Sequence, residues 1–249
     1  MTSVFIHNFT FAALPANGLN HQPPFNGLLA KCDFNINEYR DELFAVYAIH
    51  FPDSLQKAVA KRRAEYLAGR FVARQILNVL AVRDYPLATG VDRAPVWPAG
   101  LIGSISHNNQ RALCAAQIIT PATGYSVECS SIHGIGVDIE SLIAVERAKE
   151  LWASILSDEE YRSLQQGPLL FNQLLTLVFS AKESLFKAIY PQLGCYFDFL
   201  DARFLSYSLT SGRFELQLLR ELSDDFSAGR CFTGCFSFND SDIQTFIAY

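Results

Sequence analysis

Apolar residues recur at helical spacing in two long stretches of the chain. Over residues 54–80 they lie three and four positions apart, which predicts a helix that Asp53 or Ser54 caps. Over residues 179–190 a broad apolar arc predicts a second helix, which Pro191 is expected to end.

A shorter helix is predicted from the pattern of its first turn. Ser157 followed three residues later by Glu160 forms a capping box, in which each side chain accepts a hydrogen bond from the other residue's backbone N–H. Gly167 lies beyond this segment and fits the end of the helix.

Alternating or β-branched stretches predict strands between and after these helices. They lie at 42–52, 111–119, 132–141, 202–219 and 231–249, the last two each being a strand pair around a turn. The mixed order of strands and helices predicts an α/β (α+β) fold. Turn-forming residues gather at 120–131, which predicts a division of the chain there.

The helix predicted over 179–190 carries an unusual polar stripe. The stripe consists of Ser180, Glu183, Ser184 and Lys187, and it is narrower than the polar face of an ordinary surface helix. Lys182 falls inside the apolar arc. Glu183 and Lys187 are four residues apart in the order that favours an ion pair, so a plain salt bridge is the alternative to a functional role.

Two acids share one face of the strand predicted over 132–141. Asp138 and Glu140 alternate with Val137 and Ile139, so both carboxylates point to the same side. Neighbouring carboxylates repel unless a cation lies between them, and hard oxygen ligands suit Mg²⁺. An exposed edge strand with a polar face is the alternative. If Glu183 packs against this strand, three carboxylates converge.

Basic and small polar residues in the first half suggest an anion site. Arg62, Arg70 and Arg74 fall near one side of the helix predicted over 54–80, which fits either a solvated face or an anion-binding face. His107 lies in "GSISHNN", whose small residues suit a backbone that approaches a phosphate closely. A loop histidine without a ligand is the alternative for His107.

Composition narrows the function classes. The chain has 249 residues, of which 50% are hydrophobic and 18% charged, as in core-rich globular proteins. A net charge of −5 argues against a nucleic-acid-coating protein. Six irregularly spaced cysteines predict neither a zinc site nor a disulfide framework, but buried reduced thiols in a cytosolic protein. The sequence predicts no signal peptide and no transmembrane helix, while the 20 phenylalanines leave membrane-surface association open.

Four segments, taken in order, resemble one enzyme family. "RRAEYLAGRFVAR", "RAPVWPAGLIGSISH", "GVDIE" and "FSAKESLFKA" are similar to motifs of the surfactin-type 4′-phosphopantetheinyl transferases, and the second of them is most similar to the siderophore-associated, enterobactin-type branch. The resemblance covers about residues 55–190. "GVDIE" alone is a weak signal, whereas the four segments together are specific.

The resemblance implies a reaction and an architecture. The phosphopantetheine arm of coenzyme A would pass to a serine of an apo carrier domain, peptidyl or aryl, of a nonribosomal peptide or siderophore synthetase, leaving adenosine 3′,5′-bisphosphate. Two similar α/β subdomains would form a pseudo-twofold pair with the site in the cleft between them: 1–124 with the coenzyme A nucleotide contacts, and 125–249 with the magnesium and catalytic residues. We expect a cytoplasmic monomer that binds no nucleic acid. An idle coenzyme A-binding module and a Mg²⁺-dependent phosphohydrolase are the alternatives.

The same resemblance implies roles for individual residues. The Mg²⁺ ligands would be Asp138, Glu140 and Glu183, and the catalytic residues Glu183, Lys187 and Asp138. Coenzyme A would be held by Arg62, Arg70, Arg93, Ser106, His107 and Lys187. Glu183 and Lys187 both remain open as the base that takes the serine proton. The groove for the carrier is unplaced, with 21–27 and 151–175 as candidates.

Overall fold

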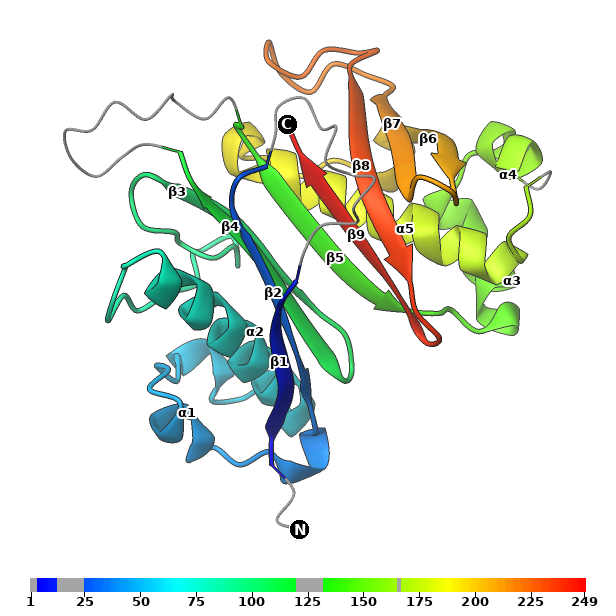
Figure 1. Ribbon diagram of the computed structural model, residues 1–249. Coiled ribbons are helices and arrows are strands. Elements are labelled where there is room, and N and C mark those ends of the chain that lie inside the picture. The colour runs from blue at the N-terminus through cyan, green and yellow to red at the C-terminus, as the bar shows by residue number, and fades with distance from the viewer. Residues whose placement is uncertain (1–3, 13–24, 120–131, 165–166) are drawn as a thin grey trace. The chain divides into compact units, whose positions relative to one another are not determined.

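The computed structural model describes residues 4–12, 25–119, 132–164 and 167–249 (Figure 1). The chain divides into two compact units, one formed by 1–13 and 26–131 and the other by 14–25 and 132–249. The boundary predicted between residues 124 and 125 lies outside the described residues. The division into 1–124 and 125–249 stays a prediction, as does the cleft between the two parts.

The first unit is a four-stranded antiparallel sheet with one long helix. The strands are β1 (Ile6–Ala12), β2 (Leu28–Phe34), β3 (Leu101–His107) and β4 (Arg111–Ile118), in the order β1-β2-β4-β3. Helix α2 (Ala60–Val79) packs mainly on β4 and β2. Small residues of α2, such as Ala64, Ala68 and Ala73, are fully buried and allow the helix to lie close to the sheet.

Two predictions for this unit are wrong. Residues 42–52 do not form a strand, since they contain the short helix α1 (Leu43–Val46), followed by Ala48 at a φ of 51°. The aromatic residues that suggested a strand instead pack locally, with the rings of Phe44 and Phe51 at 4.7 Å. Helix α2 begins after a separate 3₁₀ turn at Asp53–Leu55, so its N-cap is Val59 rather than Asp53 or Ser54.

The second unit is a five-stranded antiparallel sheet. Its strands are β5 (Ile135–Ser141), β6 (Ala202–Ser208), β7 (Arg213–Leu218), β8 (Cys231–Phe238) and β9 (Asp242–Ala248), in the order β5-β9-β8-β7-β6. Helices α3 (Val145–Ile155) and α4 (Asp158–Leu164) precede the long α5 (Phe171–Leu193), which lies on β5 and β9 (Figure 1). The two strand pairs predicted in this unit are confirmed, and so is the mixed α+β class.

Helix α5 does not end at Pro191. It continues to Leu193 and is closed by Gly194, which has a φ of 70° and donates its N–H to the carbonyl of Tyr190 at 2.8 Å. Pro191 lacks the N–H that would bond one turn back and its ring crowds that carbonyl, but only Gln192 and Leu193 follow it in the helix, so the disturbance stays within the last turn.

Lys182 forms a buried ion pair in this unit and does not reach the surface by its long stem. Only 2% of Lys182 is exposed, and its Nζ lies 2.8 Å from Glu160 Oε1 and donates to the carbonyl of Ile155 at 2.7 Å. The predicted capping box is confirmed, because Ser157 N–H donates to Glu160 at 2.8 Å and Glu160 N–H to Ser157 Oγ at 3.2 Å. Glu160 therefore links the start of α4 to α5.

Two remaining sequence predictions concern membranes and thiols. Among the described residues, no helix combines the length and hydropathy needed to cross a membrane. The described cysteines are free: Cys32, Cys114 and Cys235 are buried, whereas Cys195 and Cys231 are exposed. The prediction of buried thiols is thus correct for three of them and wrong for two, and Cys129 lies outside the described residues.

Candidate active site

Two glycines allow α5 to lie directly on one face of β5. A Cβ atom on Gly136 would fall 1.8 Å from the carbonyl oxygen of Ser184, and one on Gly134 would fall 2.4 Å from that of Ala188. Such distances exclude any side chain at these positions unless the helix moves. Asp138 lies on the same face as these glycines, so the helix backbone covers the acid. The spacing "GIGVDIE" contained this signal, which the sequence interpretation did not use.

Asp138 is buried between the strand and the helix. It is 2% exposed, although β5 is an edge strand, so the alternative of an exposed polar face is wrong. Lys187 Nζ donates to Asp138 Oδ1 at 2.6 Å, and Ser180 Oγ donates to Oδ2 at 2.7 Å. The sequence suggested Glu183 as an ion-pair partner of Lys187, whereas the structure places Lys187 in an ion pair with Asp138, which the sequence did not suggest.

The charges of Asp138 and Lys187 affect the pKa values of Glu140 and Glu183. Burial raises the pKa of Glu140 to about 8, with Asp138 adding to the rise and Lys187 opposing it. Burial also raises the pKa of Glu183, with Lys187 opposing the rise and Asp138 adding to it. The three acids thus share one ammonium group, and their environment favours an additional cation.

The pKa of Lys187 is raised, although its burial alone would lower it. Burial alone would lower the pKa of its ammonium group, but the charges of Asp138, Glu183 and Glu140 and the hydrogen bond to Asp138 together raise that pKa. Lys187 is therefore held in its charged form. It can neutralise negative charge on a carboxylate or on a phosphate.

The acids fit a metal by chemistry but are not gathered around one point. Carboxylate oxygens in a region of excess negative charge suit a hard divalent cation. Among the residues that the structure describes, however, no group of three or more His, Cys, Asp or Glu side chains is placed to hold a metal ion. The predicted set of Asp138, Glu140 and Glu183 shares an electrostatic field rather than a preformed coordination sphere.

In the first unit, the structure joins Arg62 and His107. Arg62 Nη1 lies 2.8 Å from His107 Nε2, and Glu65 Oε2 lies 3.8 Å from both Arg62 Nη1 and His107 Nδ1. A guanidinium only donates, so Nε2 accepts and the ring proton is assigned to Nδ1, towards Glu65. Sequence reasoning missed Glu65, although it follows Arg62 by three residues and thus lies on the same helix face.

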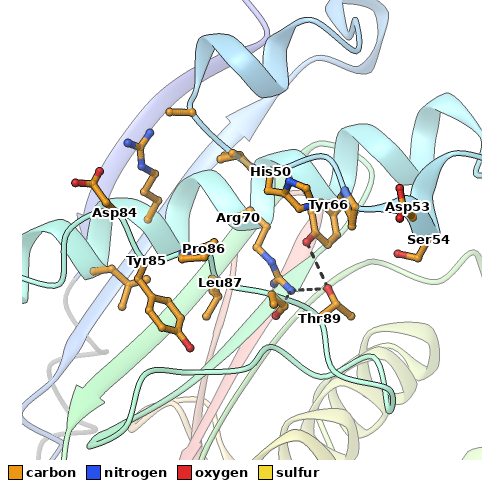
Figure 2. A pocket seen from close by; sticks show the side chains of 16 residues that line it. His50, Asp53, Ser54, Tyr66, Arg70, Asp84, Tyr85, Pro86, Leu87 and Thr89 are labelled. Atoms are coloured by element: carbon orange, nitrogen blue, oxygen red, sulfur yellow. Dashed lines mark hydrogen bonds between the residues drawn. The ribbon is translucent and has the colours of Figure 1, made fainter.

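Arg70 lies in a separate cavity of the first unit, apart from the Arg62–His107 pair. The cavity has a volume of about 690 Å³ and is lined by α2 and by loop residues from 48–54 and 84–89 (Figure 2). Arg70 is 8% exposed, its guanidinium stacks on Tyr66 at 4.7 Å, and its Nη2 donates to Thr89 Oγ1 at 2.9 Å. The Arg70 Nε is buried without a hydrogen-bond partner. It is therefore a donor that a bound anion could satisfy.

The other predicted residues of the first unit lie on β3 and in a turn. Ser106 is buried in β3, directly before His107. Arg93 is exposed at a φ of 69°, and its N–H donates to the carbonyl of Gly90 at 3.0 Å. The structure thus brings Arg62 and His107 together, while Arg70 lies in its cavity and Arg93 in an exposed turn.

Comparison with known proteins gives two family matches and several relatives. Residues 51–117 match the model of a 4′-phosphopantetheinyl transferase N-terminal domain, and residues 134–228 match the 4′-phosphopantetheinyl transferase superfamily. The chain is 39% identical over 171 residues to enterobactin synthase component D of Salmonella typhimurium, covering 68% of this chain and 66% of that protein.

Two further relatives come from other organisms. Enterobactin synthase component D of Escherichia coli K12 is 40% identical over 157 residues, covering 63% of this chain and 66% of that protein. The 4′-phosphopantetheinyl transferase Svp of Streptomyces mobaraensis is 29% identical over 177 residues, covering 71% and 66%. The chain thus spans 66% of the length of each of these relatives, just under two thirds.

Proposed function

Because the chain belongs to the 4′-phosphopantetheinyl transferase superfamily, we propose that it transfers the phosphopantetheine group of coenzyme A to a serine of an apo carrier protein domain. The products are the holo-carrier and adenosine 3′,5′-bisphosphate. The enterobactin synthase relatives support a peptidyl or aryl carrier of a siderophore or nonribosomal peptide synthetase as the acceptor. We further propose that the enzyme works as a cytoplasmic monomer.

The contact between Lys187 and Asp138 is the observation that carries this proposal. Phosphoryl transfer needs charge neutralisation and positioning more than covalent chemistry from the protein. Lys187, whose side chain is 26% exposed, lies 2.6 Å from the buried Asp138, so a positive and a negative group stand together at a partly shielded site. The attacking hydroxyl belongs to the carrier, so the chain needs no nucleophile of its own.

We assign Mg²⁺ to Asp138, Glu140 and Glu183. The fit rests on three carboxylates that interact with one ammonium group, and Asp138 adds to the rise that burial causes in the pKa of Glu140. When bound, the cation supplies positive charge to the diphosphate of coenzyme A and thereby stabilises the leaving group.

The directions of the pKa shifts favour Glu183 as the base. A carboxylate whose pKa is raised takes a proton more readily than an ordinary glutamate, whereas Lys187 is held charged and cannot take one near neutral pH. Lys187 then acts as a cation that moves from Asp138 to the phosphate being transferred. Glu183 takes the proton of the carrier serine.

The first unit supplies contacts to the nucleotide end of coenzyme A in this proposal. The Arg62–His107 pair offers an N–H fork next to a neutral imidazole, and Ser106 lies beside it on β3. Arg70 offers an unpaired buried donor, and Arg93 an exposed guanidinium. Arginines suit the 3′-phosphate because their fork binds phosphate bidentately. The carrier groove stays unplaced, and of its candidates residues 21–24 and 165–166 lie outside the described residues.

Incubation with coenzyme A, Mg²⁺ and an apo peptidyl carrier domain tests the proposal. Intact-mass measurement should show the carrier gaining one phosphopantetheine group. Phosphate release without any carrier would identify a phosphohydrolase instead. Binding of coenzyme A without turnover, with an authentic transferase modifying the same carrier in parallel, would identify an idle binding module.

A further inference from the structure

Three hydroxyl groups form a buried chain behind Asp138. Ser184 Oγ lies 2.7 Å from Thr245 Oγ1, Thr245 Oγ1 lies 2.9 Å from Ser180 Oγ, and Ser180 Oγ donates to Asp138 Oδ2 at 2.7 Å. Thr245 of β9 is paired directly with Asp138 of β5, so both side chains rise from the same face of the sheet. Ser180 and Ser184 come from α5, one turn apart, with exposures of 0% each, and Thr245 has 1%.

The direction of this chain follows from the acid at its end. An ionised carboxylate only accepts hydrogen bonds, so Ser180 must donate its single hydroxyl proton to Asp138. The proton between Thr245 and Ser180 therefore belongs to Thr245, which reaches both Oγ and the carbonyl oxygen of Ser180 at 2.9 Å. Because the proton of Thr245 is thus committed, Ser184 donates to Thr245. Ser180 thus donates to the carboxylate, Thr245 donates to oxygens of Ser180, and Ser184 donates to Thr245.

We propose that Ser180, Thr245 and Ser184 are positioning residues that fix the orientation of the Asp138 carboxylate for its cation. This inference rests on the proposed function, in which Lys187 leaves Asp138 Oδ1 for the phosphate. A cation would then take the place of Lys187 beside Oδ1, while Ser180 still donates to Oδ2. Hydrogen-bond partners of this kind keep a ligand from turning when its other oxygen changes partner.

The hydroxyl chain lies next to a close approach of α5 to β5. The close approach over Gly136 brings Ser180 and Ser184 within reach of β5 and β9. A longer side chain on the strand would separate the hydroxyls from Asp138. Four buried polar groups that satisfy one another cost little free energy, whereas removal of one leaves its neighbour unpaired. The chain is therefore stiff, and its effect on Asp138 should decrease with each hydrogen bond away from the acid.

Hydroxyl deletions along the chain test the proposal by Mn²⁺ binding. Free Mn²⁺ is measured by electron paramagnetic resonance as the full-length protein is titrated in the presence of coenzyme A and in the absence of carrier. Ser180→Ala should weaken Mn²⁺ binding about tenfold, the lower end of the effect of lost second partners at metal ligands. Thr245→Val should have a smaller effect, and Ser184→Ala the smallest.

Thr176→Val is the matched control. Thr176 lies one turn before Ser180 on α5 and is equally buried, and its hydroxyl accepts from Ile143 N–H at 3.0 Å and donates to Asn172 at 2.7 Å. Its loss should lower the thermal midpoint of unfolding as much as Thr245→Val does, with unchanged Mn²⁺ affinity.

The possible results separate this inference from the proposed function. Wild-type Mn²⁺ affinity in Ser180→Ala, or equal losses in all four variants, would overturn the positioning role. Should Ser180→Ala fail to fold, the difference between Thr245→Val and Ser184→Ala decides in its place. If the unaltered protein binds Mn²⁺ but modifies no carrier, the proposed function fails while the hydroxyl dependence is still measured.

Discussion

Two helices of similar length lie on antiparallel sheets in this chain, and they place their charged side chains differently. Helix α2 turns small residues to its sheet, and its arginines reach loop carbonyls, as Arg63 does to Leu55 and Arg70 does to Ala88. Helix α5 keeps polar and charged groups in its interfaces, where they pair with Asp138 and Glu160. The arginines of α2 thus fix neighbouring loops by hydrogen bonds to their carbonyls. The lysines of α5 instead pair with acids between the helix and the elements packed against it.

Replacement of Lys182 by Met should have the largest effect on stability. Glu160 would keep its burial and lose its counter-ion, which costs about 3–5 kcal/mol when one member of a buried pair is removed. Urea unfolding monitored by circular dichroism measures the change. The double variant Lys182→Met, Glu160→Gln should recover part of the loss, because the uncompensated charge is gone.

A matched change in the first unit sharpens this prediction. Arg63 lies 2.7 Å from Asp41 in a pair that is largely exposed on the Asp41 side, so Asp41→Asn should cost at most about 1 kcal/mol. Equal costs for the two replacements would show that the buried pair of α5 is no more important than a surface pair.

Replacement of Glu183 by Gln should lower kcat/KM for carrier modification about a thousandfold, or about 4 kcal/mol of transition-state stabilisation. In the unaltered enzyme, activity should rise with pH as Glu183 loses its proton, because a base works only after it has lost its proton. Stopped-assay pH profiles of both proteins measure this. If the residual activity of the variant keeps the same rising limb, another group is the base.

Gly136→Ala tests the close approach of α5 to β5. The added Cβ would meet the backbone of Ser184, so the helix must move, at a cost of about 3 kcal/mol, the upper end for overpacking. Activity should fall as well, since Lys187 would move away from Asp138. Thermal unfolding and the carrier assay measure the two effects.

The control is the same substitution at Gly69, which lies at the interface of α2 with its sheet. A Cβ on Gly69 of α2 would lie 3.0 Å from the Cγ2 methyl of Ile105, a side-chain contact that a shift of a few tenths of an ångström relieves, rather than from backbone. Gly69→Ala should therefore change stability by no more than about 1 kcal/mol, because helix propensity offsets the contact. Similar losses at Gly69 and Gly136 would contradict the difference between the two interfaces.

The sequence predicted the local features of the second unit well. The strand pairs after α5, the capping box of Ser157 and Glu160, and the polar stripe with Lys187 all depend on residues close in the chain, and each is present in the structure. The roles assigned to the site residues stay predictions, although the contact between Lys187 and Asp138 brings together two of them.

What could not be predicted depends on distant parts of the chain. The partner of Lys182 lies 22 residues earlier on a different helix, and no local pattern names it. Residues 42–52 have β-forming composition, but ring packing around Phe44 outweighs that propensity. The hydroxyl chain behind Asp138 joins α5 to β9 across 65 residues, so it depends on the register of the sheet.

Arg70→Ala should have the smallest effect, and it tests the first unit alone. If the unpaired donor of Arg70 binds the 3′-phosphate, the change should raise the KM for coenzyme A about tenfold and leave kcat nearly unchanged, since a contact that is equal in ground and transition states affects only binding. Arg70→Lys keeps the charge without the fork and should show an intermediate KM. Dephospho-coenzyme A, which lacks the 3′-phosphate, should give the same KM with all three proteins. An equal rise with both substrates would instead assign Arg70 to holding the loop at Ala88 and Thr89, as Arg63 and Arg74 of the same helix hold other carbonyls.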